Sequence, residues 1–203
     1  MIERHLRLRG ISDVRVREAF DLVPRERFLD EAHQSDAYAD CPLPIGYGQT
    51  ISQPYIVALM LQELDVRPEH RVLDVGAGSG YQTALLSHLA AEVHGVERIE
   101  ELAARATETL RQLGVTNATM HVGDGSLGRP ECAPFDRIIC GAASPDVPPA
   151  WIEQLADGGK IIAPVGPRDV QSLLLVEKNG ENLRRVELCG VRFVPLLGEQ
   201  GWR

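Results

Sequence analysis

The sequence predicts an α/β protein, with a doubly wound, mostly parallel sheet, an N-terminal helical extension and a C-terminal β-hairpin. Three observations lead to this class. Short apolar runs alternate with amphipathic helical segments between residues 67 and 166, a glycine-rich turn follows the first of these runs, and two strand-like runs flank Asn179-Gly180. Strands that alternate with helices build parallel sheets with right-handed crossovers, and Asn-Gly between two strands is a strong hairpin signal.

The composition limits what kind of protein this can be. With 203 residues, of which 44% are hydrophobic and 25% charged, the chain fits a single domain with a sizeable core. Its net charge of −8 argues against a surface for duplex nucleic acid, which requires a basic face. The N-terminal residues carry no apolar signal region, and no apolar run reaches membrane-spanning length. We therefore expect a cytoplasmic monomer that binds neither nucleic acid nor membrane.

The cysteines and histidines show no known metal-binding spacing. Cys41, Cys132, Cys140 and Cys189 lie far apart without a C-x-x-C pair, and the six histidines include no H-E-x-x-H pattern. From this spacing we expect neither a metal site nor a disulfide framework.

A helical leader precedes the sheet. Residues 2–9 and 13–22 place Leu, Val and Phe side chains at helical spacing. Gly10 can end the first helix, and Ser12 or Asp13 can cap the second.

Residues 38–54 predict a loop, because they contain several prolines and glycines. The segment is also rich in apolar residues, which indicates that it lies against another part of the protein. An apolar helix, 55–64, follows, so Ser52 is a candidate N-cap with Pro54 in the first turn. Spacing alone favours this capping role for Ser52, although a helix N-terminus also presents N–H groups to an anion.

The remaining elements follow in chain order. Strands are predicted at 72–75, 92–97, 118–122, 135–140 and 160–165, with helices at 82–90, 99–113 and 148–156. The hairpin strands are predicted at 172–178 and 183–188. A last strand, 191–196, contains Pro195 and therefore belongs at a sheet edge.

The glycine-rich turn predicts a binding site for a nucleotide-like cofactor. Gly76, Gly78 and Gly80 leave no Cβ where a ligand approaches the backbone, and the helix behind them offers free N–H groups. A dinucleotide site requires a small third residue, but Tyr81 occupies that position. Asp74 followed by alternating glycines instead resembles motif I of class I S-adenosylmethionine-dependent methyltransferases, where the loop faces the amino-acid part of the cofactor. A plain tight turn is the alternative.

Two further carboxylates stand at strand ends. Glu97 ends the second strand, 17 residues beyond Gly80, where a carboxylate can accept hydrogen bonds from both ribose hydroxyls of an adenosine. The alternative for Glu97 is an exposed loop acid. Asp124, followed by Gly125, ends the third strand and can reach an adenine amino group, or it can simply form an Asx-type turn.

A second resemblance extends over nearly the whole chain, and it is to the protein-L-isoaspartate O-methyltransferase family. The loop 44–54 (PIGYGQTISQP) resembles a signature that general methyltransferases lack. Further matching segments appear in the expected order at 23–28, 133–136, 141–143, 157–159, 164–166 and 191–196.

The resemblance implies an enzyme that transfers a methyl group from S-adenosylmethionine to the free carboxylate of L-isoaspartyl residues in damaged proteins. The methyl ester would then close to a succinimide, whose hydrolysis returns part of the material to aspartate. It also implies three parts of the single domain: a leader with the active-site loop (1–66), a cofactor-binding core (67–166), and a C-terminal hairpin with an edge strand (167–203).

The resemblance also assigns site residues. Ser52 matches the active-site serine of the family. Residues expected at the cofactor are Gln49, Thr50, Ile51, Asp74, Gly76, Gly78, Gly80, Glu97, Asp124 and Gly125. The segment Val194, Pro195 and Leu196 would border the peptide groove, and an edge strand there could pair with peptide backbone regardless of sequence.

The chemistry requires no strong general base, because an isoaspartyl carboxylate is already ionised at pH 7. We therefore expect the protein to supply placement and exclusion of water, with Ser52 orienting the carboxylate and not acting as a covalent nucleophile.

Three rival functions share parts of this pattern. A methyltransferase of the same scaffold could act on a dedicated peptide carboxylate, and only substrate assays would distinguish it. A nicotinamide-dependent oxidoreductase is disfavoured by Tyr81 and by the loop that ends at Ser52. A binding module without catalysis would bind the cofactor but release no methanol from a methyl ester.

Overall fold

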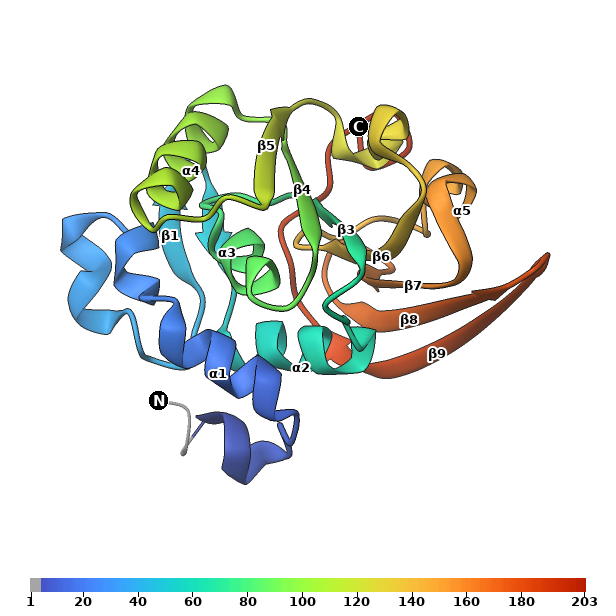
Figure 1. Cartoon of the computed structure of the whole chain (residues 1–203). Coiled ribbons are helices and arrows are strands. Elements are labelled where there is room, and N and C mark those ends of the chain that lie inside the picture. Colours follow the sequence, from blue (N-terminus) through green and yellow to red (C-terminus); the bar gives the residue numbers. More distant parts are fainter. Residues whose placement is uncertain (1–4) are drawn as a thin grey trace.

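A seven-stranded sheet forms the centre of the protein in the computed structural model, which describes residues 5–203 (Figure 1). The strand order is β5-β4-β3-β6-β7-β8-β9. The first five strands in this order run parallel, and β8 and β9 continue the sheet as antiparallel strands. The strands are β3 (Arg71–Val75), β4 (Glu92–Glu97), β5 (Ala118–Val122), β6 (Phe135–Cys140), β7 (Leu155–Val165), β8 (Gln171–Asn179) and β9 (Asn182–Val191). The predicted doubly wound fold with a C-terminal hairpin is confirmed.

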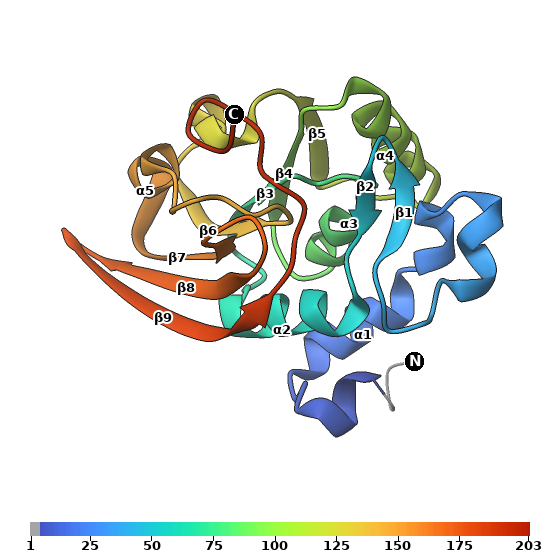
Figure 2. The same cartoon turned by 180° about the vertical axis from the view of Figure 1, so that it is seen from behind.

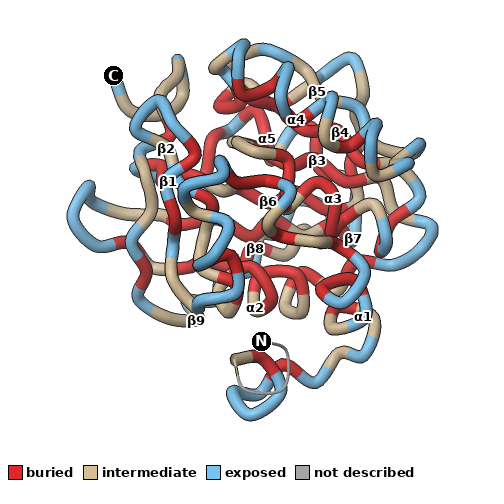
Figure 3. Tube along the Cα trace, turned by 90° about the vertical axis from the view of Figure 1, so that its left-hand side faces the viewer, coloured by how far each residue is buried: buried red, intermediate tan, exposed pale blue. Residues whose placement is uncertain are grey.

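Helices cover the two faces of the sheet unequally. The helices are α1 (Val14–Leu22), α2 (Pro54–Leu64), α3 (Tyr81–Ser87), α4 (Glu100–Gln112) and α5 (Pro149–Gln154). Helices α2, α3 and α4 share one apolar cluster with the first face, and α1 packs on α2 and α3. The opposite face packs on α5 and on the short 3₁₀ turns η5 (Gly125–Leu127) and η6 (Pro130–Cys132). Figure 3 shows the central strands in the buried interior.

One predicted helix cap is confirmed, and a glycine ends a second helix. Asp13 caps α1, because its side chain accepts a hydrogen bond from the N–H of Arg15. Gly114 follows α4 with a φ of 72°, in the left-handed region that commonly ends helices.

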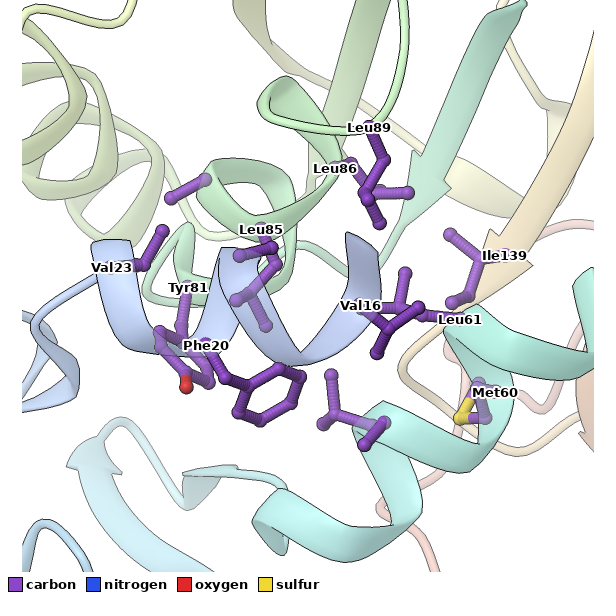
Figure 4. Close-up of a cluster of buried hydrophobic side chains, with 14 of the residues drawn as sticks. Val16, Phe20, Val23, Met60, Leu61, Tyr81, Leu85, Leu86, Leu89 and Ile139 are labelled. Carbon is purple, nitrogen blue, oxygen red and sulfur yellow. The ribbon is translucent and has the colours of Figure 1, made fainter. Parts of the chain in front are cut away.

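The leader packs against the start of α3 through aromatic side chains (Figure 4). Tyr81 is buried and makes edge contacts with Phe20 at 6.0 Å and with Phe28 at 5.4 Å between ring centroids. The buried guanidinium of Arg25 lies 5.1 Å from the Tyr81 ring and donates from Nε to the Ala37 carbonyl. Tyr81 occupies the position where a dinucleotide-binding motif has a small residue. Here its side chain holds the N-terminal extension on the core.

The predicted leader helix over residues 2–9 is not seen as one element. A 3₁₀ turn, η2 (Arg7–Arg9), ends at Gly10, whose φ of 93° confirms it as a stop, and residues 2–4 of the predicted helix lie outside the described part. Two further 3₁₀ turns follow α1, namely η3 (Arg25–Phe28) and η4 (Glu31–Asp36).

The loop predicted over residues 38–54 contains a β-hairpin, so that prediction was wrong in its second half. Strands β1 (Leu43–Gly46) and β2 (Gln49–Ile51) pair antiparallel around Tyr47-Gly48. Both turn residues have positive φ, 55° and 71°, as a type I′ turn requires. Tyrosine rarely adopts a positive φ, so this turn could not be predicted from the residue types at positions 47 and 48. Ile45 and Ile51 are buried, which confirms that the segment lies against the rest of the protein.

The predicted edge strand over 191–196 was also wrong, because β9 ends at Val191. Residues 192–196 contain one isolated bridge, between Pro195 and Ala143, and Leu197 bridges to Trp202 further along. Pro195 has no N–H to donate, so a regular ladder cannot continue through it. Instead the segment crosses the sheet at the carboxyl end of β6, on the same side of the molecule as the β1–β2 hairpin (Figure 2).

Helix α5 is shorter and β7 longer than predicted. The helix ends at Gln154, and β7 begins at once with Leu155, so Gly158 and Gly159 lie inside the strand. Gly158 has a φ of 73°, and the pairing with β6 is irregular near its start. A bulge at two glycines explains why the sequence showed a turn before the strand.

Candidate functional site

The glycine turn after β3 lines a cleft at the carboxyl ends of the parallel strands. Gly76 and Gly78 have φ values of 69° and 56°, which only glycine adopts readily. The turn is fixed to the sheet, because the Gly76 N–H donates to the Val96 carbonyl at 2.9 Å. A Cβ at Gly78 would lie 3.2 Å from Ile45 Cδ1 of the hairpin, so a side chain there would enter the space between the turn and β1.

Gly80, which was also predicted at the cofactor, faces α4. Its φ is 84°, and a Cβ there would lie only 2.9 Å from Ala106 Cβ. The structure therefore gives this glycine a packing role between the turn and α4.

Asp74 lies beneath the turn and is fully buried. Its carboxylate accepts hydrogen bonds from Thr83 Oγ1 at 2.6 Å and from Gln82 Nε2 at 2.7 Å, both on α3. Burial raises the pKa of Asp74 to about 6 despite these two hydrogen bonds. Asp74 thus joins β3 to the first turn of α3, and it supports the cleft from behind.

Glu97 ends β4 inside the cleft. Its two carboxylate oxygens accept backbone hydrogen bonds at 2.9 Å, one from Gly78 and one from Ile99. The side chain is held in one orientation, and each oxygen keeps a lone pair for a further donor.

The carboxylate of Asp124 accepts hydrogen bonds from other residues of the protein. Its Oδ1 accepts from the Ser126 N–H at 2.9 Å, which is the Asx-type turn that was the alternative, and its Oδ2 accepts from the Glu199 N–H at 2.7 Å. The adjacent Gly125 lines the cleft, and its carbonyl accepts from the Trp151 indole at 2.9 Å. Asp124 therefore holds the C-terminal residues beside the cleft.

The opposite wall of the cleft consists of the β1–β2 hairpin and the residues after it. Gln49 and Thr50 line the cleft, and Ile51, although largely buried, lines it beside the glycine turn. Ser52 follows β2 and is partly exposed. Within residues 5–203 its hydroxyl makes no hydrogen bond, so it is available to a ligand.

Ser52 does not cap α2, so the capping interpretation was wrong. Gln53 occupies the N-cap position, and Pro54 begins the helix as expected. Asp40, which lies earlier in the chain, accepts from the Tyr55 N–H at 3.0 Å and from Gln53 Nε2 at 2.8 Å. Asp40 could not be predicted from local sequence, because it acts on a helix that begins 14 residues later.

The C-terminal segment forms the third side of the cleft. The carbonyl of Val194 accepts from the Ala143 N–H at 2.8 Å, and the Leu196 N–H donates to the Ala143 carbonyl at 2.7 Å. The buried Gln171 accepts from the Phe193 N–H at 3.0 Å. Within the described part of the chain the Val194 N–H has no partner, so it remains free to bind a ligand.

Three adjoining cavities make up the cleft. The Glu97 pocket, about 570 Å³, lies between Glu97, Gly125 and Leu196. The glycine-turn pocket lies beside Gly76 and Ser52. The surface groove, about 720 Å³ and partly open to solvent, runs along residues 190–194. Both volumes include space that is open to solvent, so they describe clefts and not enclosed cavities.

Thr50 and Gly141 line all three cavities, and Ser52 lines the glycine-turn pocket and the groove. The cavities therefore meet at the end of β6. Gly141 fits there because a Cβ would lie 2.9 Å from the Gly76 carbonyl oxygen. Gly141 belongs to a segment, 141–143, that matches the family, but its place in the site could not be predicted because it depends on how β6 pairs with β3.

Comparison with known proteins identifies a family that covers nearly the whole chain. The family model "Protein-L-isoaspartate(D-aspartate) O-methyltransferase (PCMT)" matches residues 1–201. A protein-L-isoaspartate O-methyltransferase from Roseiflexus sp. (strain RS-1) is 54% identical over 96% of this chain and 89% of its own length. Another, from Methanoculleus marisnigri, is 50% identical over 100% of this chain and 92% of its own length.

Solved structures give the same result. A protein-L-isoaspartate O-methyltransferase matches 99% of this chain and 67% of its own, with a TM-score of 0.90 and 30% identity. A Plasmodium falciparum protein described as belonging to the same group, in complex with S-adenosyl-L-homocysteine, matches 94% of each chain with a TM-score of 0.82 and 29% identity.

Proposed function

This chain belongs to the protein-L-isoaspartate(D-aspartate) O-methyltransferase family, and we propose that its three cavities hold methyl donor and substrate on either side of Ser52. The enzyme uses S-adenosylmethionine to methylate isoaspartyl residues, which serves protein repair. The observation that supports the proposed arrangement is the meeting of all three cavities at Thr50 and Gly141.

The residues of the Glu97 pocket and the glycine-turn pocket suit this cofactor. Glu97 keeps acceptor capacity for hydroxyl donors, and the left-handed glycines leave backbone exposed between the turn and the hairpin. Gln49, Thr50, Gly76, Gly78 and Gly125 would hold the group from three sides. Asp74 and Gly80 would support the glycine turn from behind the cleft. Asp124 would act indirectly, by holding the backbone of the adjacent Gly125. When bound, S-adenosylmethionine supplies a methyl group on a positively charged sulfur that requires no further activation.

Ser52 would orient the substrate carboxylate by donating a hydrogen bond. Its hydroxyl borders both the groove and the glycine-turn pocket, and no residue of the described part engages it. A carboxylate that is ionised at pH 7 needs placement and not deprotonation. Holding the reacting atoms in line and keeping water out contributes on the order of 7–11 kcal/mol in well-oriented systems.

The surface groove would bind the peptide backbone of the substrate. The free Val194 N–H stands where the groove meets the Glu97 pocket, and Pro195 and Leu196 continue the wall towards that pocket. Backbone hydrogen bonds carry no side-chain information, which suits an enzyme that meets isoaspartate in many sequences. Closure of the resulting methyl ester to a succinimide would then follow outside the enzyme's own chemistry.

Methyl transfer from labelled S-adenosylmethionine to one peptide, made in its L-isoaspartyl and L-aspartyl forms, tests this function. We expect label only in the isoaspartyl form, followed by methanol release. Equal labelling of both forms would contradict a groove that recognises the additional backbone methylene.

The role of Ser52 is tested by Ser52→Ala. We expect kcat to fall about 10- to 100-fold, because a hydrogen bond to a charged group contributes about 1.5–3 kcal/mol. The affinity for S-adenosylhomocysteine, measured by calorimetry, should stay the same. Ser87→Ala is the matched control, since Ser87 only donates to the Ala84 carbonyl within α3. A loss of cofactor affinity in Ser52→Ala would contradict the orienting role.

We also propose that one chain suffices and forms one methyltransferase domain, with parts 1–66, 67–166 and 167–203. The net charge of −8 supports a partner that is neither nucleic acid nor an anionic membrane. None of the helices within residues 5–203 has both the length and the apolar character needed to cross a bilayer. The four free cysteines support a reducing, cytoplasmic location.

A further inference from the structure

A histidine pair and a cysteine lie together on the sheet face opposite α3, away from the three cavities. His94 of β4 and His121 of β5 project from the same face, on diagonally adjacent positions of the paired strands. Their rings stack at 5.4 Å, and His94 Nδ1 lies 3.1 Å from His121 Nε2. Cys132 of η6 completes the group, with one ligand atom from each of the three residues within 4.8 Å of the others.

We propose that His94, His121 and Cys132 form a binding site for a divalent transition metal, with Zn²⁺ as the best match. Two imidazoles and a thiolate are the ligands that zinc prefers, whereas magnesium and calcium prefer oxygen. Ligand nitrogens on one tetrahedral zinc are about 3.3 Å apart, given bonds of about 2.0–2.1 Å. The two histidine nitrogens already have nearly this separation, and the three ligand atoms of the cluster lie within 4.8 Å of one another.

The surroundings of His94 support this assignment. Its second ring nitrogen, Nε2, is buried 3.0 Å from Glu92 Oε1, at ion-pair distance but outside hydrogen-bond geometry, while Nδ1 faces His121. A carboxylate behind a histidine is the usual arrangement that orients a metal ligand and increases its basicity. Arg71 fixes that carboxylate at 2.8 Å and also donates to the Cys132 carbonyl at 3.3 Å. One arginine therefore positions both the outer carboxylate and the loop that carries the thiol.

Local charge also permits a cation. Arg71 pairs with Glu92, and Arg129 lies 3.3 Å from Glu131, so each nearby arginine has an acidic partner. Burial of His94 against Phe135, with ring centroids 5.9 Å apart, limits access by water. The three ligands come from β4, β5 and η6, which are up to 38 residues apart in sequence, so motif spacing could not predict the cluster.

A metal here would join the β5–β6 connection to the sheet. In most crossovers of this fold a helix covers the sheet, but between β5 and β6 only η5 and η6 are present. The same connection carries Gly125 of the Glu97 pocket. The expected role is therefore to stabilise this connection, by an amount that grows with metal concentration relative to Kd.

The test uses Co²⁺ as a spectroscopic substitute for Zn²⁺ on the reduced, full-length protein. We expect a near-ultraviolet thiolate-to-cobalt band and visible bands of tetrahedral cobalt, which Zn²⁺ abolishes by competition. Cys132→Ser should lose the thiolate band, and His121→Ala should bind at least 100-fold more weakly. Glu92→Gln should bind about 10- to 100-fold more weakly, because it removes only the outer carboxylate. Zn²⁺ should raise the Tm of the wild type and not that of His121→Ala.

Cys189→Ser and His88→Ala are the matched controls, since neither residue lies in the cluster, and both should bind like the wild type. Methyl transfer by each variant verifies that it is folded. Absence of the thiolate band in the wild type at saturating Co²⁺ would overturn the proposal, as would a band that persists in Cys132→Ser.

Discussion

The two long walls of the cleft are built in different ways. The glycine turn, Glu97 and Gly125 belong to the ends of parallel strands, and their backbone is bonded directly to the sheet. The hairpin with Ser52 and the segment 192–197 come from outside the parallel core. The side chains of Asp40 and Gln171 help to hold them, together with the backbone hydrogen bonds that Val194 and Leu196 make with Ala143. We therefore expect changes in the first wall to alter stability and cofactor affinity, and changes in the second to alter turnover and peptide binding.

The largest expected effect concerns the carboxyl group buried beneath the first wall. Burial raises the pKa of Asp74 to about 6 from its ordinary value of 3.8. Between these values the folded protein holds a proton that the unfolded chain has released, so stability falls as pH rises from about 4 to about 6. Asp74→Asn does not titrate. Its free energy of unfolding, relative to wild type, should therefore rise by roughly 3 kcal/mol across this window.

Urea unfolding at several pH values between 4 and 7.5 measures this difference. Asp169→Asn, at an exposed position, is the control and should show no such slope. A difference between Asp74→Asn and wild type that stays constant with pH would mean that Asp74 is ionised in the folded protein throughout.

Gly141→Ala tests the point where the walls meet. The new Cβ would lie 2.9 Å from the Gly76 carbonyl oxygen, so the end of β6 or the glycine turn must shift. A misplacement of reacting groups by about 1 Å can reduce turnover about 100-fold, and we expect a fall in kcat of that size.

Gly190→Ala is the matched control for this change. Gly190 also lines the surface groove, but a Cβ there meets nothing within 4 Å and its φ is not positive. Equal losses in the two variants would show that the junction at Gly141 has no special role.

Glu97→Gln tests the first wall at its cofactor-facing carboxylate. Glutamine offers one acceptor oxygen, so one of the two N–H groups, from Gly78 or Ile99, faces an amide donor. We expect the Kd for S-adenosylhomocysteine to rise about 30-fold, which corresponds to about 2 kcal/mol. Calorimetry measures it, with the exposed Glu101→Gln as control. An unchanged Kd would remove Glu97 from the cofactor site.

The difference between the two walls also explains which parts of the site could be predicted from the sequence. Strands β4, β5 and β6 were predicted at their observed bounds, because apolar runs and glycine stops are local signals. Gly76, Gly78 and Glu97 could be placed in the cleft since strand ends of a parallel sheet share one edge. The second wall depends on pairings that no local pattern encodes. The positive φ of Tyr47, the crossing of residues 192–196 and the contact of Asp40 with Tyr55 are all set by tertiary packing.

The smallest effect is expected from Asp40→Ala in the second wall. This change removes the acceptor for the Tyr55 N–H and for Gln53 Nε2, next to Ser52. Loss of an N-terminal helix acceptor costs about 1 kcal/mol of stability. The ion pair with Arg9 adds little because the Arg9 side chain is 42% exposed, although that of Asp40 is only 9% exposed. We expect Tm to fall by a few degrees and peptide KM to rise about threefold, with cofactor Kd unchanged. Thermal melts and steady-state kinetics measure these values, and Asp36→Ala in η4 is the control. A rise in cofactor Kd as large as the rise in peptide KM would show that the two walls do not act independently. The hairpin would then be transmitting the change to the glycine turn, where Ile45 lies next to Gly78.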